Sequence, residues 1–284
     1  MKYRTALCLI IKDELDLDEW IIYHKLIGFD HIYIYDNNEI PVDLDHKNCT
    51  HIHFPGSVEQ INAYNHWIKS FKSECEYVCF IDADEYVVFN SNYNSVGEVL
   101  NALPNDHDAL ILNRKLFVNI EEQRKEGLVF ETNKIWQKFW FRENYKEKPF
   151  LINFENAIKT FSKTELIKKI DNPHTIDYYL DSINFYSGTL NSKCEVKNFS
   201  YWIKEEPQIW INHYYIKSLS EFRHKCLVRG RATTHEKRNL TKELNGSTSR
   251  FNPNSVLSSE PTEILLWNKK VKRYLDEFEK QRYN

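Results

Sequence analysis

The chain has 284 residues, of which 42% are hydrophobic and 28% charged, a composition that fits a globular protein and excludes a disordered or fibrous one. A formal net charge of −3 gives no overall attraction for nucleic acid or anionic lipid, so a phosphate-binding site has to be built from local side chains. The six cysteines lack CxxC spacing, which argues against a zinc knuckle and favours a reducing, cytoplasmic location.

The first half of the chain predicts four strands. Continuous apolar runs at residues 5–11 and 77–81 are typical of strands that are buried on both faces of a sheet. Residues 31–35 alternate in polarity and predict a third strand, and residues 51–54 predict a short fourth one.

Two helices are predicted between these strands. Apolar residues at helical spacing predict one helix over residues 17–27, opened by a capping box of Asp16 and Glu19 and closed by Gly28. A second capping box, Ser57 with Gln60, opens a helix that runs to about residue 71. The alternation of strands and helices favours an α/β fold with a doubly wound, mostly parallel sheet and helices on both faces.

The second half of the chain is less regular. It predicts strands at residues 109–112, 158–161, 183–186 and 209–214, and a helix at residues 219–228. We expect residues 1–232 to form one domain and residues 233–284 to add a mobile loop and a C-terminal amphipathic helix.

The C-terminal helix predicted at residues 263–282 is basic and carries Trp267. Such a helix can lie on an anionic membrane surface, although most amphipathic helices dock on their own domain. No apolar segment approaches the length of a transmembrane helix. We therefore expect a cytoplasmic protein that is soluble, or at most peripheral at the inner face of a membrane through this helix; the sequence gives no oligomeric state.

Asp82 and Asp84 form the sharpest chemical signal in the sequence. They are one residue apart and directly follow the apolar run at residues 77–81. Two such carboxylates supply the hard oxygen ligands that Mn²⁺ or Mg²⁺ prefers, and a metal there could bridge the oxygens of a diphosphate. A DxD string alone is as often a solvated turn, but its place at the end of a buried strand favours a metal site. Glu85 follows directly and predicts either a residue that orients a ligand or a surface carboxylate.

Other polar side chains follow the first two predicted strands. Lys12 and Glu14 come after the first strand, and Asp36 comes after the second. Ligands of open α/β sheets bind beyond the carboxyl ends of the strands, so we expect these three residues and the Asp82–Asp84 pair to share one crevice.

Three blocks of the sequence resemble the glycosyltransferases of family 92 and the related family 2-like group, the DUF23-like enzymes. The first is similar to the opening pattern EW-x-x-YH followed by H-x-x-IYDN, the second to the metal motif IDxDEF with Tyr86 in place of the usual Phe, and the third to NHY-x-x-KS-x-x-EF-x-x-K-x-x-RG. In this chain the blocks read Glu19-Trp20-Ile21-Ile22-Tyr23-His24 with His31-Ile32-Tyr33-Ile34-Tyr35-Asp36-Asn37, then Phe80-Ile81-Asp82-Ala83-Asp84-Glu85-Tyr86, and finally Asn212-His213-Tyr214-Tyr215-Ile216-Lys217-Ser218 with Glu221-Phe222, Lys225 and Arg229-Gly230.

The resemblance covers about residues 5–232 and implies a GT-A-type fold, a nucleotide-sugar donor and a divalent metal, Mn²⁺ or Mg²⁺. Carried over to this chain, it implies that Asp82 and Asp84 hold the metal and the donor diphosphate. It also places Asp36 near the nucleoside and Lys12 and Glu14 in the same pocket.

The third block adds candidates at the donor site. His213 lies in an apolar strand, where a lone histidine is usually a core residue, but the resemblance and the affinity of imidazole for Mn²⁺ predict a metal contact. Lys217, Lys225 and Arg229 could neutralise the diphosphate as the sugar leaves, or could simply form a solvated basic helix face.

No sequence motif identifies the residues that would bind the sugar acceptor. A transferase that inverts the anomeric configuration, which the resemblance favours, needs a base for the acceptor hydroxyl, and Glu155 and Asp177 are the candidates in the second half of the chain. His174 lies in an Asn-Pro-His turn and could approach the acceptor, although a surface loop histidine is the commoner case.

We therefore expect a metal-dependent glycosyltransferase that moves a sugar from a nucleotide sugar, with UDP as the favoured nucleotide, to a saccharide or lipid-linked saccharide. A role in bacterial surface polysaccharide or lipopolysaccharide synthesis fits the abundance of Asn, Lys, Ile and Tyr, and no nucleic-acid partner is expected. One alternative is a metal-dependent nucleotidyltransferase, although the chain has only 7 glycines and no glycine-rich loop after the first strand. The other is a non-catalytic carbohydrate-binding protein with the same fold.

Overall fold

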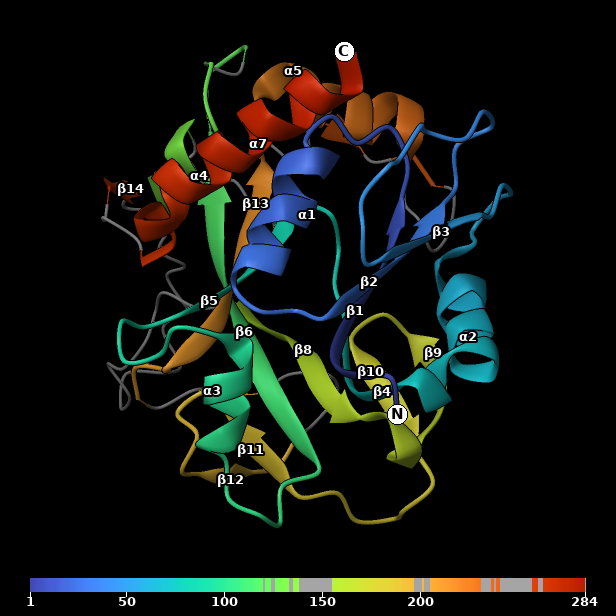
Figure 1. Ribbon diagram of the computed structural model, residues 1–284, viewed down its shortest axis with the longest axis vertical. Coiled ribbons are helices and arrows are strands. Elements are labelled where there is room, and N and C mark those ends of the chain that lie inside the picture. The colour runs from blue at the N-terminus through green and yellow to red at the C-terminus, as the bar shows by residue number, and fades with distance from the viewer. Residues whose placement is uncertain are drawn as a thin grey trace.

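A large β-sheet with helices on both faces organises the molecule (Figure 1). The computed structural model describes residues 1–119, 121–123, 126–132, 135–137, 155–196, 201, 205–230, 236–237, 239–240, 257–259 and 263–283. Across these residues the sheet has 12 strands, and a separate two-stranded ribbon lies beside it. The α/β class predicted from the sequence is confirmed.

The sheet strands are β1 (Tyr3–Ile11), β2 (His31–Asp36), β3 (Cys49–His53), β4 (Cys75–Phe80), β5 (Glu85–Phe89), β6 (Ala109–Val118), β7 (Ile135–Gln137), β8 (Glu155–Lys163), β11 (Phe185–Ser187), β12 (Lys193–Cys194), β13 (Ile209–Ile216) and β14 (Leu257–Ser259). The ribbon pairs β9 (Ile167–Asn172) with β10 (Thr175–Tyr178). The α-helices are α1 (Leu17–Leu26), α2 (Gln60–Ser70), α3 (Val96–Asn101), α4 (Val129–Thr132), α5 (Leu219–His224) and α7 (Asn268–Tyr283).

The N-terminal half of the sheet is parallel, as predicted, in the order β3-β2-β1-β4. Beyond β4 the sheet becomes mixed. β8 lies between β4 and β6 and is antiparallel to both, while β13 runs parallel to β6 and antiparallel to β5. This second half brings residues that are distant in the sequence next to the turn between β4 and β5.

The two faces of the sheet follow from the alternation of side chains along β1. Leu7, Leu9 and Ile11 belong to the core cluster that includes α1. Ala6 and Cys8 point to the other face and pack in the cluster that includes α2. Because successive side chains of a strand point to opposite faces, a strand buried on both faces reads as a continuous apolar run, which is what the sequence shows.

Both predicted helices form, but neither capping box does. Asp16 and Glu59 precede α1 and α2 without a side-chain bond to the helix backbone. Glu19 reaches sideways instead and accepts a hydrogen bond from the backbone N–H of Val129 at 3.0 Å. The prediction for the end of the first helix is confirmed, since Gly28 follows α1 with a φ of 101°.

The C-terminal helix docks on its own domain, where α7 lies against α1 (Figure 1). Ile264, in the 3₁₀ turn that precedes α7, and Val271 are fully buried, and the ring of Phe278 stacks on His46 at 4.1 Å between centroids. Most of the loop predicted at residues 233–261 lies outside the described residues, and the domain boundary at residue 232 stays a prediction. No helix among the described residues is both long and apolar enough to cross a membrane.

Candidate functional site

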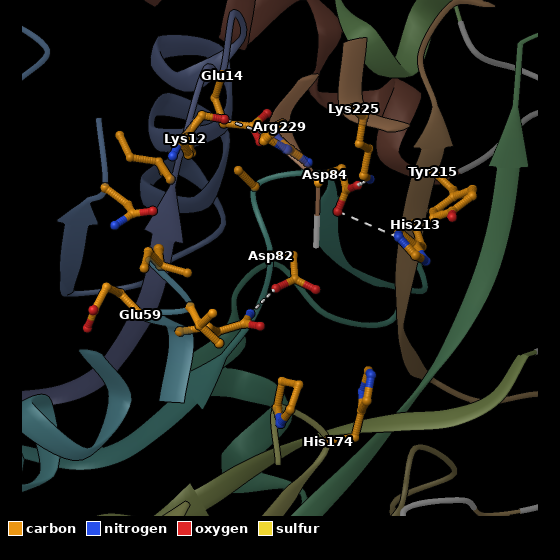
Figure 2. A pocket seen from close by; sticks show the side chains of 18 of the residues that line it. Lys12, Glu14, Glu59, Asp82, Asp84, His174, His213, Tyr215, Lys225 and Arg229 are labelled. Atoms are coloured by element: carbon orange, nitrogen blue, oxygen red, sulfur yellow. Dashed lines mark hydrogen bonds and ion pairs between the residues drawn. The ribbon is translucent and has the colours of Figure 1, made fainter. Parts of the chain in front are cut away.

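A cavity of about 230 Å³ opens at the carboxyl ends of β1 and β4 (Figure 2). Of the residues predicted for the site, Lys12, Glu14, Asp82, Asp84, His213, Lys225 and Arg229 line this cavity. The structure therefore brings together side chains from the first strand end, the β4–β5 turn, β13 and the segment after α5. The convergence follows from the parallel arrangement of β1 and β4, whose carboxyl ends meet at one edge of the sheet.

Asp82 is the first residue of the site and is held from two sides. Its Oδ1 accepts a hydrogen bond from Gln60 at 2.9 Å, and its Oδ2 accepts one from the ammonium group of Lys159 at 3.2 Å. Burial acts to raise the pKa of Asp82, but the lowering contributions around it, the charge of Lys159 first among them, together outweigh it, and the pKa falls to about 2. The carboxylate is therefore ionised at neutral pH, and 34% of the side chain stays exposed toward the cavity.

Asp84 is paired with two groups from the C-terminal part of the chain. Its Oδ2 accepts a hydrogen bond from Lys225, and its Oδ1 lies 3.5 Å from Nε2 of His213 (Figure 2). Although burial opposes the charge, Lys225 and His213 together hold the pKa of Asp84 well below its ordinary value.

The pairing of β13 with β5 explains why His213 reaches Asp84. Glu85, the first residue of β5, lies opposite His213 in the antiparallel register, and the N–H of Tyr214 donates to the carbonyl of Asp84 at 2.7 Å. The predicted contact between the Asp82–Asp84 pair and the third sequence block is thus a direct consequence of strand pairing.

Glu85 is fully buried beneath the turn and does not line the cavity. Its Oε2 accepts a hydrogen bond from the backbone N–H of Asp82 at 3.0 Å, and its Oε1 pairs with Arg114 at 3.0 Å. Lys159 lies 3.4 Å from the same Oε2. Of the two readings of Glu85, the structure supports the one in which it orients a site residue, because it fixes the backbone of Asp82.

A second ionic cluster joins the first strand end to the third block. Arg229 pairs with the carboxylate of Glu14 and donates to the backbone carbonyl of Lys12 at 3.0 Å. Lys217 lies 2.9 Å from Asp16 and 3.5 Å from Glu14. Lys217 lines a neighbouring pocket, which shares Glu14, Asp84, Lys225 and Arg229 with the main cavity.

Arg229 ends a π-helical turn, Lys225–Arg229, that follows directly on α5. Such turns occur frequently at functional sites. The turn places the ends of both Lys225 and Arg229 at the cavity, where they pair with Asp84 and Glu14. The predicted basic set is therefore not a solvated helix face.

The carboxylate of Asp36 is not directed at the cavity. It is fully buried and accepts hydrogen bonds from the backbone N–H groups of Asn38 at 3.0 Å and Val42 at 2.7 Å, and from His51 at 3.0 Å. These bonds hold the loop that follows β2. The neighbouring Asn37 lines the cavity instead, so this strand end contributes a different residue from the one predicted.

Of the two candidate bases, Asp177 is not brought to the cavity. Asp177 lies on the ribbon strand β10, where its half-exposed carboxylate is 3.5 Å from Lys169. Glu155 begins β8 opposite Arg114 in the sheet register. Asp177 does not line the cavity, and the side chain of Glu155 lies outside the described part of the structure, so its role as a base stays a prediction.

The structure also adds site residues that the sequence did not indicate. Lys159, Arg114 and Gln60 surround the Asp82 turn. His174, for which the sequence favoured a surface loop, lines the cavity from the β9–β10 turn. A lysine inside the apolar strand at residues 158–161 was the one available signal, because a charged residue is almost never fully buried unless it is paired.

Asp84 and His213 offer an oxygen and a nitrogen ligand to the same cavity, with Asp82 beside them. Among the described residues, no three His, Cys, Asp or Glu side chains are grouped closely enough to hold a metal by themselves. Mg²⁺ is typically bound by one or two carboxylates and completes its shell with water and substrate phosphates, and imidazole suits transition metals. The side chains present therefore fit Mn²⁺ or Mg²⁺ whose shell is completed by a phosphate-bearing ligand.

The chain is similar to plant proteins of glycosyltransferase family 92. A family 92 protein of Oryza sativa subsp. japonica is 33% identical over 99 residues, which are 32% of this chain and 17% of the rice protein. A Ricinus communis relative is 30% identical over 94 residues, 30% of this chain and 16% of its own length. An Arabidopsis thaliana relative is 29% identical over 98 residues, 31% of this chain and 17% of its own length.

These matches confirm the resemblance to family 92 that the three sequence blocks indicated. Each match covers less than a fifth of the relative's length and about a third of this chain. No family model matches the chain.

Proposed function

We propose that this chain, a relative of the family 92 glycosyltransferases over about a third of its length, is itself a glycosyltransferase. The donor is a nucleotide sugar, with UDP as the expected nucleotide, and a divalent cation assists the transfer. The observation that carries this proposal is the convergence of Asp82, Asp84 and His213 with Lys225 and Arg229 on one cavity at the carboxyl edge of the sheet.

The charges of the cavity match a nucleoside diphosphate. Lys225 and Arg229 are paired with Asp84 and Glu14 and lie where a donor diphosphate would replace these carboxylates as partners. Their positive charges would stabilise the negative charge that develops on the leaving diphosphate. Arg229 suits this role because its guanidinium can bind two phosphate oxygens at once.

The residues that would hold the cation are Asp84 and His213, with Asp82 at their side. When bound there, Mn²⁺ or Mg²⁺ supplies Lewis-acid stabilisation of the diphosphate oxygens. Glu85 and Lys159 keep the Asp82 turn in place, because they bind its backbone N–H and its carboxylate. The side chains of the turn are thus fixed before a donor arrives, and no binding energy is spent on ordering them.

The acceptor is proposed to be a saccharide or a lipid-linked saccharide. A role in bacterial surface polysaccharide or lipopolysaccharide synthesis, expected from the residue composition, stays a prediction; the relatives named above are plant proteins.

Membrane contact through α7 also stays a prediction. Its apolar residues Val271 and Phe278 pack on the domain, as does Ile264 in the preceding turn, whereas Lys269, Lys270, Lys272 and Arg273 are exposed. A contact made by α7 would therefore be electrostatic. Co-sedimentation with vesicles of phosphatidylglycerol would then be lost at high salt and in a variant with all four basic residues changed to Gln.

Donor hydrolysis tests the proposed function. A panel of nucleotide sugars is incubated with the full chain and Mn²⁺, with and without chelator, and nucleotide release is measured. We expect release from one or more UDP-sugars, its loss with chelator, and its loss in Asp84→Asn. Asp106→Asn is the matched control, because Asp106 is about half-exposed and pairs with Lys193 away from the cavity.

The same panel separates the alternatives. A nucleotidyltransferase would release pyrophosphate from a nucleoside triphosphate and a sugar phosphate, and would leave nucleotide sugars intact. A non-catalytic carbohydrate-binding protein would release nothing, and its affinity for UDP would not depend on Mn²⁺. Either pattern would contradict the proposed function.

A further inference from the structure

His174 lines the donor cavity and has no part in the function proposed so far. It lies in the turn between β9 and β10, in the sequence Asn172-Pro173-His174, and its backbone N–H donates to the side chain of Asn172 at 2.9 Å. Figure 2 shows the ring standing on the side of the cavity opposite Asp84 and facing the same space as Asp82 and His213. The ribbon therefore contributes an imidazole to the wall of the cavity.

The hydrogen bond made by Nδ1 of His174 determines whether Nε2 carries a hydrogen. Nδ1 of His174 lies 3.2 Å from the backbone carbonyl oxygen of Ile158. A carbonyl oxygen can only accept, so Nδ1 carries the hydrogen. In the neutral ring Nε2 then has a lone pair and no hydrogen, and it is a hydrogen-bond acceptor at the cavity.

The surroundings keep the ring neutral. Burial is the largest cause that lowers the pKa of His174, the charges of Lys159 on β8 and Arg114 on β6 lower it further, and Asp82 opposes them; the pKa falls to about 3. The acceptor character of Nε2 is therefore present throughout the physiological pH range.

The carboxylates of the cavity are already engaged. Asp82, Asp84 and Glu14 pair with Lys159, Lys225 and Arg229 respectively. Glu59 accepts a hydrogen bond from Asn62 at 3.0 Å and lies on the far side of Asp82 from His174 (Figure 2). Each of these carboxylates thus already has a partner, whereas Nε2 of His174 offers a lone pair at the cavity.

We propose that Nε2 of His174 accepts the hydrogen bond of the attacking hydroxyl and takes its proton, so that His174 is the catalytic base of the proposed glycosyl transfer. This inference rests on the proposed function. In the step, the hydroxyl oxygen forms a bond to the anomeric carbon, and the bond from that carbon to the diphosphate oxygen breaks. Its electron pair leaves with the nucleoside diphosphate, and the hydroxyl proton moves to Nε2.

A weak base is sufficient for this step. When the anomeric carbon carries most of the positive charge, the attacking hydroxyl becomes strongly acidic only as its new bond forms. The proton then moves downhill even to an imidazole that is a poor base in the free protein.

Chemical rescue tests the proposal. The probes are UDP-glucose and UDP-galactose, with water and with methyl β-galactoside as acceptors, and the readouts are UDP release and calorimetric binding of UDP with Mn²⁺. His174→Ala should lower UDP release by about 10²–10⁴-fold, and added imidazole should restore part of it. UDP binding should change by less than about two-fold, because the ring is not assigned to the diphosphate.

His174→Asn guards against a loss of structure, because its amide nitrogen takes the place of Nδ1. Its amide can still donate to the Ile158 carbonyl, so the turn should fold, but an amide cannot take a proton, and UDP release should fall as far as in His174→Ala. UDP release close to that of the unaltered chain in either variant, or a loss that imidazole does not restore, would overturn the proposal. Failure of the proposed function looks different: the unaltered chain would itself neither bind UDP with Mn²⁺ nor release UDP from a donor.

Discussion

The ammonium nitrogen of Lys159 lies 3.2 Å from Oδ2 of Asp82, so the first carboxylate of the candidate site is neutralised from inside the fold. The same nitrogen is 3.4 Å from Glu85, and Arg114 pairs with the other oxygen of Glu85 at 3.0 Å. Two cations and two carboxylates thus balance one another beneath the turn. The side chains of Lys159, Arg114 and Glu85 are at most 2% exposed, which makes the balance energetically important.

Removing Lys159 should destabilise the protein strongly. Lys159→Met keeps the length of the side chain but leaves Glu85 and Asp82 with one cation fewer in a buried setting. Breaking a buried ion pair on one side typically costs about 3–5 kcal/mol. We expect a loss of that size in the free energy of unfolding, measured by urea denaturation.

Lys168→Met is the matched control, because Lys168 is exposed on β9. It should change the free energy of unfolding by less than about 0.5 kcal/mol. Equal effects of the two substitutions would show that the network does not stabilise the turn.

His24 should make the fold sensitive to mild acid. The ring is fully buried: Nδ1 donates to the carbonyl of Trp20 at 2.8 Å, and Nε2 accepts from the N–H of Val87 at 3.3 Å. Burial lowers the pKa of His24 from 6.5 to about 3. Between these two values the unfolded chain binds a proton that the folded chain does not, so stability falls as the pH falls below about 6.5.

His24→Gln removes the group that binds this proton in the unfolded chain. The slope of the unfolding free energy against pH, measured between pH 6.5 and 4.5, should decrease by up to about 1.4 kcal/mol per pH unit relative to the unaltered chain. His53→Gln, which changes an exposed ring at the end of β3, is measured beside it as the control for the substitution itself. An undiminished slope in His24→Gln would contradict the assignment.

Arg229 should contribute to donor affinity. If its guanidinium exchanges Glu14 for the diphosphate, Arg229→Gln loses hydrogen bonds to a charged group, each worth about 1.5–3 kcal/mol. The affinity for UDP in the presence of Mn²⁺ should therefore fall by about 10- to 100-fold in calorimetry. Arg223→Gln is the control, since Arg223 pairs with Glu122 and is 46% exposed; an equal loss in both variants would count against a specific role.

Ile264 should anchor the C-terminal helix to the domain. It is fully buried, whereas Leu266, two residues further, is 71% exposed. Ile264→Ala should lower the free energy of unfolding by about 2–5 kcal/mol because it leaves a cavity in the core. Leu266→Ala should stay within about 0.5 kcal/mol, and an equally small effect of Ile264→Ala would mean that the helix is not docked in solution.

The sequence predicted the parts of the fold that depend on local pattern. The parallel strands around β1 read as apolar runs because both of their faces are buried, and Asp82 and Asp84 stand out because they end such a run. The direction of β8 could not be predicted in this way. Only its antiparallel placement between β4 and β6 puts Lys159 beneath Asp82, and that placement depends on contacts between distant segments.

The site residues that the sequence missed or misplaced also depend on contacts between distant segments. Asp36 is the last residue of β2, and Asp82 follows the end of β4 by two residues, so the two look alike in the sequence. The loop after β2 folds back, however, and its backbone N–H groups donate hydrogen bonds to the carboxylate of Asp36. His174 looked like a surface turn residue because nothing local shows that the ribbon leans over the cavity. His213 could be proposed only from the resemblance to family 92, since its pairing opposite Glu85 is a property of the folded sheet.

The most direct test of the central claim is calorimetric titration of the full chain with UDP, with Mn²⁺ and with chelator, repeated on Asp84→Asn. If Asp84 and His213 hold a cation that binds the donor diphosphate, UDP binds the unaltered chain with Mn²⁺ and loses most of its affinity both with chelator and in Asp84→Asn. UDP binding that is equally tight with chelator and in Asp84→Asn, or no binding under any condition, would contradict the account.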